Sequence, residues 1–169
     1  YTVAVVGLES SVRLLLEITH TSEEHFLDSS SELLQRQLLE KSSPHTFRFV
    51  HAQIQTVTLN LMNTYQKRKL HRAAAQGIET LFGHALSQYF ADLGFHWQEA
   101  GDTARAKPYY LQAARKAKDR YAHGEAERLF QNFLNLIETP NSESSEAQLE
   151  LGAVIDLEGR WEEALEIYE

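Results

Sequence analysis

The sequence predicts a mainly α-helical protein built from antiparallel helix pairs, preceded by a small segment that carries a short β-hairpin. Two observations lead to this prediction. Apolar residues recur at helical spacing over most of the chain, and one pattern of small and aromatic residues occurs twice, 58 residues apart. The 169 residues are 43% hydrophobic, which is enough to build the core of one or two small domains.

Helical stripes of apolar residues are clearest after residue 65. Their members are Leu70, Ala74, Ile78, Leu81 and Phe82; then Leu86, Tyr89, Phe90, Leu93 and Trp97; then Ala126, Leu129, Phe130, Phe133, Leu134 and Ile137. Each stripe covers one helix face, which has to be buried against a neighbouring helix. Between the stripes, Gly101-Asp102, Gly124, Thr139–Ser142 and Gly159-Arg160 predict turns, and Ser144 and Ser145 are candidate helix caps.

The first fifty residues show a different pattern. Thr21 and Glu24 have the spacing of a capping box that opens a helix. Two short apolar runs, 37–40 and 46–50, flank the turn 41–45, and the second run alternates with the period of a strand. Helix, helix and β-hairpin are the outline of a winged-helix domain, which we assign to residues 1–50.

The internal repeat defines the C-terminal half, residues 84–169. Leu93-Gly94 recurs as Leu151-Gly152, Gly101 as Gly159, Ala106 as Ala164, and Tyr110 as Tyr168. The small residues allow two helices to approach closely, and we expect each tyrosine to fill the space toward the next pair. With Trp97 included, the pattern resembles the tetratricopeptide repeat. Ala126, Phe130 and Phe133 look like the second helix of a shortened middle unit.

A second resemblance covers the connecting helices, residues 51–83, and the hairpin before them. Phe49, His51, Leu70 and His71, together with Arg68, Ala73 and Ala74, resemble the junction between the winged helix and the tetratricopeptide repeats in bacterial STAND-type signalling ATPases, including those associated with class III adenylate or guanylate cyclases. The resemblance implies a relay between an ATP-binding module and a repeat-based sensor. Because the chain lacks a G-x-x-x-x-G-K-[ST] loop, ATP hydrolysis is not assigned to it.

Residues with catalytic or ligating side chains do not assemble into a recognisable site in the sequence. The histidines, at positions 20, 25, 45, 51, 71, 84, 96 and 123, lack H-E-x-x-H spacing, and no Cys is present. Residues Ser29–Ser31 lack the context of a nucleophile elbow and are interpreted as a helix cap or turn. We therefore expect no catalytic residue, no metal and no cofactor, and interpret His51 and His71 as buried or half-buried packing residues.

The partner predicted from these patterns is a protein or peptide, or another domain of the same chain. If the first helix of each pair lines a groove, Gln88, Phe95 and Gln98 are the candidate contact residues. A DNA-binding winged-helix regulator is the alternative. A net charge of −8 and a recognition segment with only Arg36 against Glu32 and Glu40 argue against nucleic acid.

The setting predicted by the sequence is cytoplasmic, with no membrane span. Because the chain begins at Tyr1 without Met and ends at Glu169 within an amphipathic stripe, we expect a piece of a longer protein, truncated within its last repeat. The edge exposed there leaves homodimerisation open. Cations concentrate between Asp102 and Arg120, whereas ten carboxylates and one Arg follow from Glu138 onward.

Overall fold

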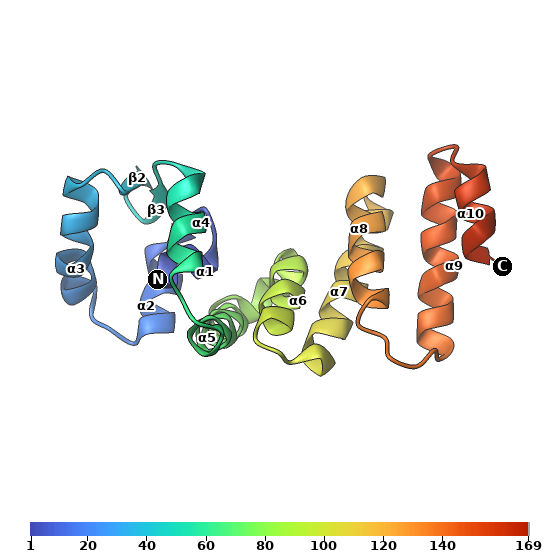
Figure 1. Cartoon of the computed structure of the whole chain (residues 1–169), viewed down its shortest axis with the longest axis horizontal. Helices are drawn as coiled ribbons and strands as arrows, with labels where there is room; N and C mark the ends of the chain where they lie inside the picture. The colour runs from blue at the N-terminus through green and yellow to red at the C-terminus, as the bar shows by residue number, and fades with distance from the viewer. Residues whose placement is uncertain (169) are drawn as a thin grey trace. The chain divides into compact units, whose positions relative to one another are not determined.

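The computed structural model describes residues 1–168 and is mainly helical, with one small antiparallel sheet (Figure 1). The chain forms two compact units, Tyr1–His84 (unit 1) and Ala85–Glu169 (unit 2). A short 3-10 segment, Gly83–Gln88, spans the boundary and is kinked at Ala85.

Unit 1 combines helices with a three-stranded sheet. Its elements are α1 (Thr2–Val6), β1 (Glu9–Ser11), α2 (Val12–Thr19), α3 (Glu23–Gln35), β2 (Leu39–Ser43), β3 (Thr46–Phe49), α4 (Ala52–Asn60) and α5 (Thr64–Phe82). The strands are antiparallel in the order β1-β3-β2. The expected hairpin is present, although β2 extends through Ser43 and leaves only Pro44-His45 as the turn. Strand β1 was not expected, because three residues are too few to show alternation.

The core of unit 1 lies beneath this sheet. Val12, Leu15, Leu39 and Phe47 are buried together, and the Phe26 ring meets Phe47 edge-on with ring centres 5.6 Å apart. Ser22, rather than Thr21, caps α3, since its Oγ accepts a hydrogen bond from the His25 amide at 3.3 Å. The capping box at Thr21 and Glu24 was therefore assigned one residue too early.

Helix α5 packs against α1 and α2 along a face of small side chains. Ala74, Ala75, Gly77 and Ile78 are buried there, and a Cβ at Gly77 would lie 3.2 Å from Leu14. Asn63 and Gln66 close a capping box at the start of the helix, each side chain bonded to the other's backbone. The close packing and the cap together fix where α5 begins and which of its faces remains exposed.

Unit 2 is an array of consecutively packed helices. Its elements are α6 (Phe90–Glu99), α7 (Thr103–Asp119), α8 (His123–Leu134), α9 (Ser142–Leu157) and α10 (Trp161–Tyr168). Asn141 caps α9, with Ser144 as the reciprocal partner, so the cap lies three residues before the expected Ser144. Gly124 lies inside α8 rather than in a break.

Three turns of unit 2 share one backbone conformation. Gly101, Tyr121 and Gly159 are left-handed, with φ of 81°, 59° and 77°. After each, the next amide donates to the carbonyl five residues back: Asp102 to Trp97, Ala122 to Ala117, and Arg160 to Ile155. This 6→1 bond is the Schellman motif. Helix α7 lies between two such turns, so it is the second helix of one hairpin and the first of the next.

The tyrosines of the repeated pattern lie over glycines of the preceding helix. A Cβ built on Gly94 would come within 2.6 Å of the Tyr110 ring, and one built on Gly152 would collide with Tyr168 in the same way. The expectation that these tyrosines fill the space toward the next pair was therefore wrong; each closes its own hairpin. Ala114 and Phe130 occupy the equivalent positions of the α7–α8 hairpin, and both are fully buried.

Replacing Gly94 or Gly152 with Ala should destabilise the protein, because the added methyl overlaps the ring of Tyr110 or of Tyr168. We expect a loss of about 1–3 kcal/mol in the free energy of unfolding, measured by urea denaturation. Gly124→Ala is the control, since nothing lies within 4 Å of its Cβ position and alanine favours the helix. Equal stability of the Gly94→Ala protein and the unsubstituted protein would contradict the packing described above.

Candidate interaction surfaces

The expected groove residues of unit 2 do not share one helix face. Phe95 and Gln98 are three residues apart on α6, but Gln88 precedes the helix, in the 3-10 segment. The Phe95 side chain is 46% exposed. Gln98 is half-buried, and its Oε1 accepts a hydrogen bond of 2.8 Å from the Tyr110 hydroxyl. The structure therefore leaves Phe95 as the accessible apolar contact of this set and gives Gln98 a role inside the hairpin.

Gln88 instead lines a polar pocket of about 330 Å³ beside the C-terminal half of α7. Lys116 of α7 and Arg120, which follows the helix, line this pocket, and each bonds to another residue of unit 2. Lys116 Nζ donates to the Ser87 carbonyl oxygen at 2.7 Å, and Arg120 pairs with Glu125 at 3.1 Å. The cations therefore connect α7 to the 3-10 segment and to α8.

A second charge cluster joins α7 to α9. Glu150 of α9 accepts hydrogen bonds from Arg115 Nε at 2.8 Å and from Lys118 Nζ. Burial alone would raise the pKa of Glu150, but the bonds from Lys118 and Arg115 outweigh it and lower the pKa. Most cations between Asp102 and Arg120 therefore bond to other residues of unit 2. Their spacing in the sequence did not indicate this.

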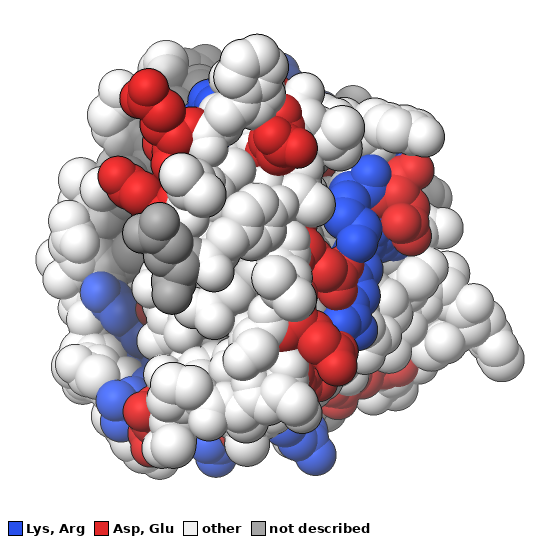
Figure 2. All heavy atoms as spheres, turned by 90° about the vertical axis from the view of Figure 1, so that its right-hand side faces the viewer, with Lys and Arg blue, Asp and Glu red and all other residues white. Residues whose placement is uncertain are grey.

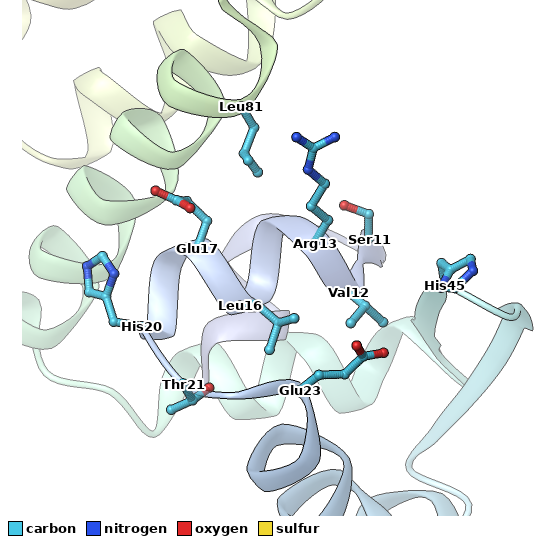
Figure 3. Close-up of a pocket in the computed structure, with 10 residues that line it drawn as sticks. All are labelled: Ser11, Val12, Arg13, Leu16, Glu17, His20, Thr21, Glu23, His45 and Leu81. Carbon is cyan, nitrogen blue, oxygen red and sulfur yellow. The ribbon is translucent and has the colours of Figure 1, made fainter.

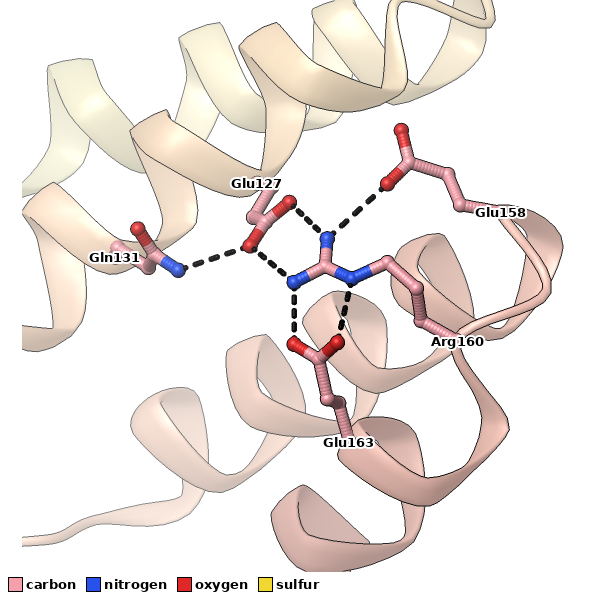
Figure 4. Close-up of polar contacts among 5 residues, drawn as sticks. All are labelled: Glu127, Gln131, Glu158, Arg160 and Glu163. Carbon is pink, nitrogen blue, oxygen red and sulfur yellow. Dashed lines mark hydrogen bonds and ion pairs between the residues drawn. The ribbon is translucent and has the colours of Figure 1, made fainter.

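Arg160 forms the third cluster, at the turn between α9 and α10 (Figure 4). Its guanidinium bonds to Glu127 of α8 at 2.7 Å, to Glu163 of α10 at 2.9 Å and to Glu158 at 3.2 Å. Gln131 in turn donates to Glu127 at 3.1 Å. A guanidinium fork shared by several carboxylates holds its geometry better than an isolated surface pair. The cluster fixes the last hairpin against α8.

The last hairpin exposes an apolar surface, which we call the α9–α10 surface. Its large side chains are 46–70% exposed: Leu149 and Leu157 on α9, and Trp161, Leu165 and Tyr168 on α10. Helix α9 is apolar on two sides, since Leu151, Val154 and Ile155 face the core. Figure 2 views this end of the chain and shows uncharged residues over much of it, with acidic and basic residues around them. Exposed apolar groups gathered in this way are typical of an interaction site.

Unit 1 contains an open pocket of about 710 Å³ between α2, the start of α3 and the β-hairpin turn (Figure 3). His20 and His45 lie at its opposite ends, with Arg13, Glu17 and Glu23 around it. Within residues 1–168, no group of three His, Asp or Glu side chains is arranged to hold a metal ion. The pocket is a surface hollow with mixed charges on its rim.

Helix α3, which contains the first part of the expected recognition segment, is acidic. Its carboxylates are Glu23, Glu24, Asp28 and Glu32. Arg36, which caps the helix, pairs with Glu32 at 2.7 Å. Ser29, Ser30 and Ser31 lie inside α3 and donate to backbone carbonyls three or four residues back. Their interpretation as a cap or turn was therefore wrong; they bond back to the helix that contains them.

The residues of the predicted junction separate into two groups. Phe49 packs against the core beneath the sheet, whereas Leu70 and His71 lie on α5. His71 is 5% exposed. His51 is exposed at the N-cap of α4, contrary to the expectation that it packs, because the chain there leaves the sheet and enters a surface helix.

No protein-family model, curated protein or solved structure matches the chain. Among the described residues, no helix is both long and apolar enough to cross a bilayer. The surfaces described above are therefore the basis for a functional proposal.

Protonation of His71 should destabilise unit 1. Burial, with a contribution from Lys67, lowers the pKa of His71 from 6.5 to about 4. As the pH falls, His71 therefore takes up its proton at a higher pH in the unfolded chain than in the folded one. The contribution of neutral His71 to the free energy of unfolding is fully present above pH 6.5 and is lost as the pH falls toward 4. We expect His71 to contribute about 1–3 kcal/mol to this loss. Chemical denaturation across this pH range measures it.

His71→Gln should flatten the dependence of stability on pH in that window. His51→Gln is the matched control for loss of one imidazole, since its side chain is exposed. An unchanged slope in His71→Gln would refute the assignment.

Proposed function

We propose that the chain is a non-catalytic protein-interaction and signal-relay module of a larger cytoplasmic signalling ATPase or transcriptional regulator. The α9–α10 surface is the observation that carries this proposal. Its five large apolar side chains include Trp161 and Tyr168, and aromatic residues are enriched where proteins bind one another. The surface belongs to a hairpin that Arg160 and Glu150 fix to its neighbours, so it is presented on a rigid element.

A tetratricopeptide-type repeat for unit 2 is part of the proposal. The three Schellman turns and the pairing of Gly94 with Tyr110 and of Gly152 with Tyr168 support it. The sharing of α7 by two hairpins accounts for the unusual offset: the middle turn follows the first by 20 residues and precedes the last by 38. A short middle unit therefore arises without loss of helix packing.

A winged-helix assignment for residues 1–50 is supported by the element order there, α1-β1-α2-α3-β2-β3, and by the sheet order β1-β3-β2. The acidic exposed face of α3 suits contacts with protein better than contacts with phosphates. Together with the resemblance to STAND-type ATPases, this supports a relay role in which unit 1 contacts other domains of its parent protein.

Peptides selected for binding to the chain from a random display library test the interaction role. We expect alanine at Trp161 and Leu149 to weaken the selected peptides at least about tenfold, because both side chains are exposed anchors. The triple variant Gln88→Ala, Phe95→Ala and Gln98→Ala tests the α6 contact residues in the same titration. If none of these substitutions changes the affinity of the selected peptides, neither surface is the binding site and both are removed from the proposal.

The alternative, a DNA-binding winged helix, is favoured by the topology of unit 1 and opposed by the charge of α3. We expect no duplex shift by the chain in about 50 mM salt, where phosphate contacts are strongest. Electrophoretic mobility measures it, with Arg36→Ala as the informative variant. Salt-sensitive binding that Arg36→Ala weakens would reverse the choice between the two functions.

A further inference from the structure

A basic surface on unit 1 is complementary in charge to the carboxylates of α10, which lie beside the α9–α10 surface. From Lys41 to Ile78 the sequence contains six Lys and Arg residues and no Asp or Glu, although the whole chain has a net charge of −8. Within this stretch, Tyr65, Arg68, Lys69 and Arg72 are exposed on the side of α5 opposite its buried residues. Among residues 1–168, no carboxylate forms an ion pair with Arg68, Lys69 or Arg72. We call these four residues the α5 surface.

The α5 surface also has an apolar component. Tyr65 is 76% exposed, and Leu61, four residues earlier at the corner between α4 and α5, is 70% exposed. Tyrosine and arginine are enriched at the centres of protein interfaces, where lysine and glutamate are depleted. On α5, the exposed Tyr65 ring is followed by cations one and two turns later. This arrangement is complementary to an apolar helix that has carboxylates along its edge, because the ring can contact the apolar face and the cations can pair with the carboxylates.

Helix α10 has those properties. Trp161, Leu165 and Tyr168 recur at i, i+4 and i+7, which places them on one face. Glu162 and Glu166 run beside this row, and both are exposed. Pairing of α10 with the α10 of another copy would bring these carboxylates together, and like charges at an interface cost affinity.

Most of the cations between Arg105 and Arg120 are less suited to receive α10, because they already have partners. Arg115 and Lys118 are bonded to Glu150, Lys116 is bonded to Ser87, and Arg120 is bonded to Glu125. Arg105 lies over the Trp97 ring, 4.4 Å from its centre. The α5 surface therefore offers cations without the cost of breaking a contact within the chain.

We propose that the chain self-associates head to tail, with α10 of one copy docked on the α5 surface of a second copy. This inference rests on the proposed protein-binding role of the α9–α10 surface and names its partner. Because the two surfaces differ, the contact is heterologous, and it forms either a closed ring or an open chain of copies. An interface formed by one helix belongs to the small, transient class, with a dissociation constant on the order of 10 µM.

Charge reversal tests the pairing directly. Sedimentation equilibrium of the whole chain should show association that weakens as salt rises from about 50 to about 500 mM. Arg68→Glu with Arg72→Glu should weaken self-association at least about tenfold, and so should Glu162→Lys with Glu166→Lys. An equimolar mixture of the two reversed proteins should associate again, and so should one chain that carries all four changes. Circular dichroism verifies the fold of each variant.

The matched control is Arg36→Glu with Arg128→Glu, which changes the charge equally at two exposed positions that belong to neither surface. It should leave association within about twofold of the unsubstituted chain. A chain that stays monomeric to about 200 µM overturns the inference. Association that is indifferent to Arg68 and Arg72 also overturns it and assigns the contact to pairing of α10 with itself. In both cases, peptide binding at Trp161 and Leu149 remains a separate measurement, so the proposed function is judged on its own result.

Discussion

Close contact between a glycine and a tyrosine ring, in the α6–α7 and α9–α10 hairpins, is the constraint on which unit 2 depends. Gly94 lies beneath Tyr110, and Gly152 lies beneath Tyr168, at separations that leave no room for a methyl group. A left-handed residue and a 6→1 hydrogen bond reverse the chain just beyond each crossing. Since the ring can cover the small residue only when the turn has the right length, turn and crossing constrain each other. Tyr121 accepts a left-handed conformation that usually costs a non-glycine residue about 1 kcal/mol, which indicates how strongly the hairpin fixes this geometry.

Much of the architecture could be predicted from the sequence because small and aromatic residues have few alternative uses at fixed helical spacing. The 58-residue repeat located the crossings that the structure contains, and the alternation of Phe47 and Phe49 located the hairpin. Strand β1 was missed because Glu9–Ser11 has no apolar period. It becomes a strand only through its pairing with β3, which is a tertiary effect. The caps at Ser22 and Asn141 were missed by one to three residues, because neighbouring Ser, Thr and Asn residues compete for the same role.

The candidate sites were harder to predict than the fold, because exposure and pairing depend on which charges meet in space. Between Asp102 and Arg120 the sequence shows a cationic run, but Glu150 and Glu125 neutralise part of it from other helices. Conversely, Arg68, Lys69 and Arg72 were not among the expected contact residues, and within residues 1–168 the structure leaves Arg68 and Arg72 without an ion pair on the same helix face as exposed Tyr65. Gln98, one of the predicted contact residues, accepts a hydrogen bond from the Tyr110 hydroxyl, which its position in the sequence did not indicate.

The joints of unit 2 differ in how their helices are connected, and the difference bears on the proposed relay role. Helix α7 is common to two hairpins, so those hairpins cannot move independently. Seven residues, 135–141, join α8 to α9, and the contacts across this joint include two polar clusters centred on Glu150 and Arg160. In stacked helices each element is coupled chiefly to its neighbours. A partner on the α9–α10 surface would therefore act on the rest of unit 2 through these two clusters and through the buried α9 side chains Leu151, Val154 and Ile155. The α8–α9 joint is thus crossed by bonds between side chains as well as by apolar packing, and both couple the last hairpin to α7 and α8.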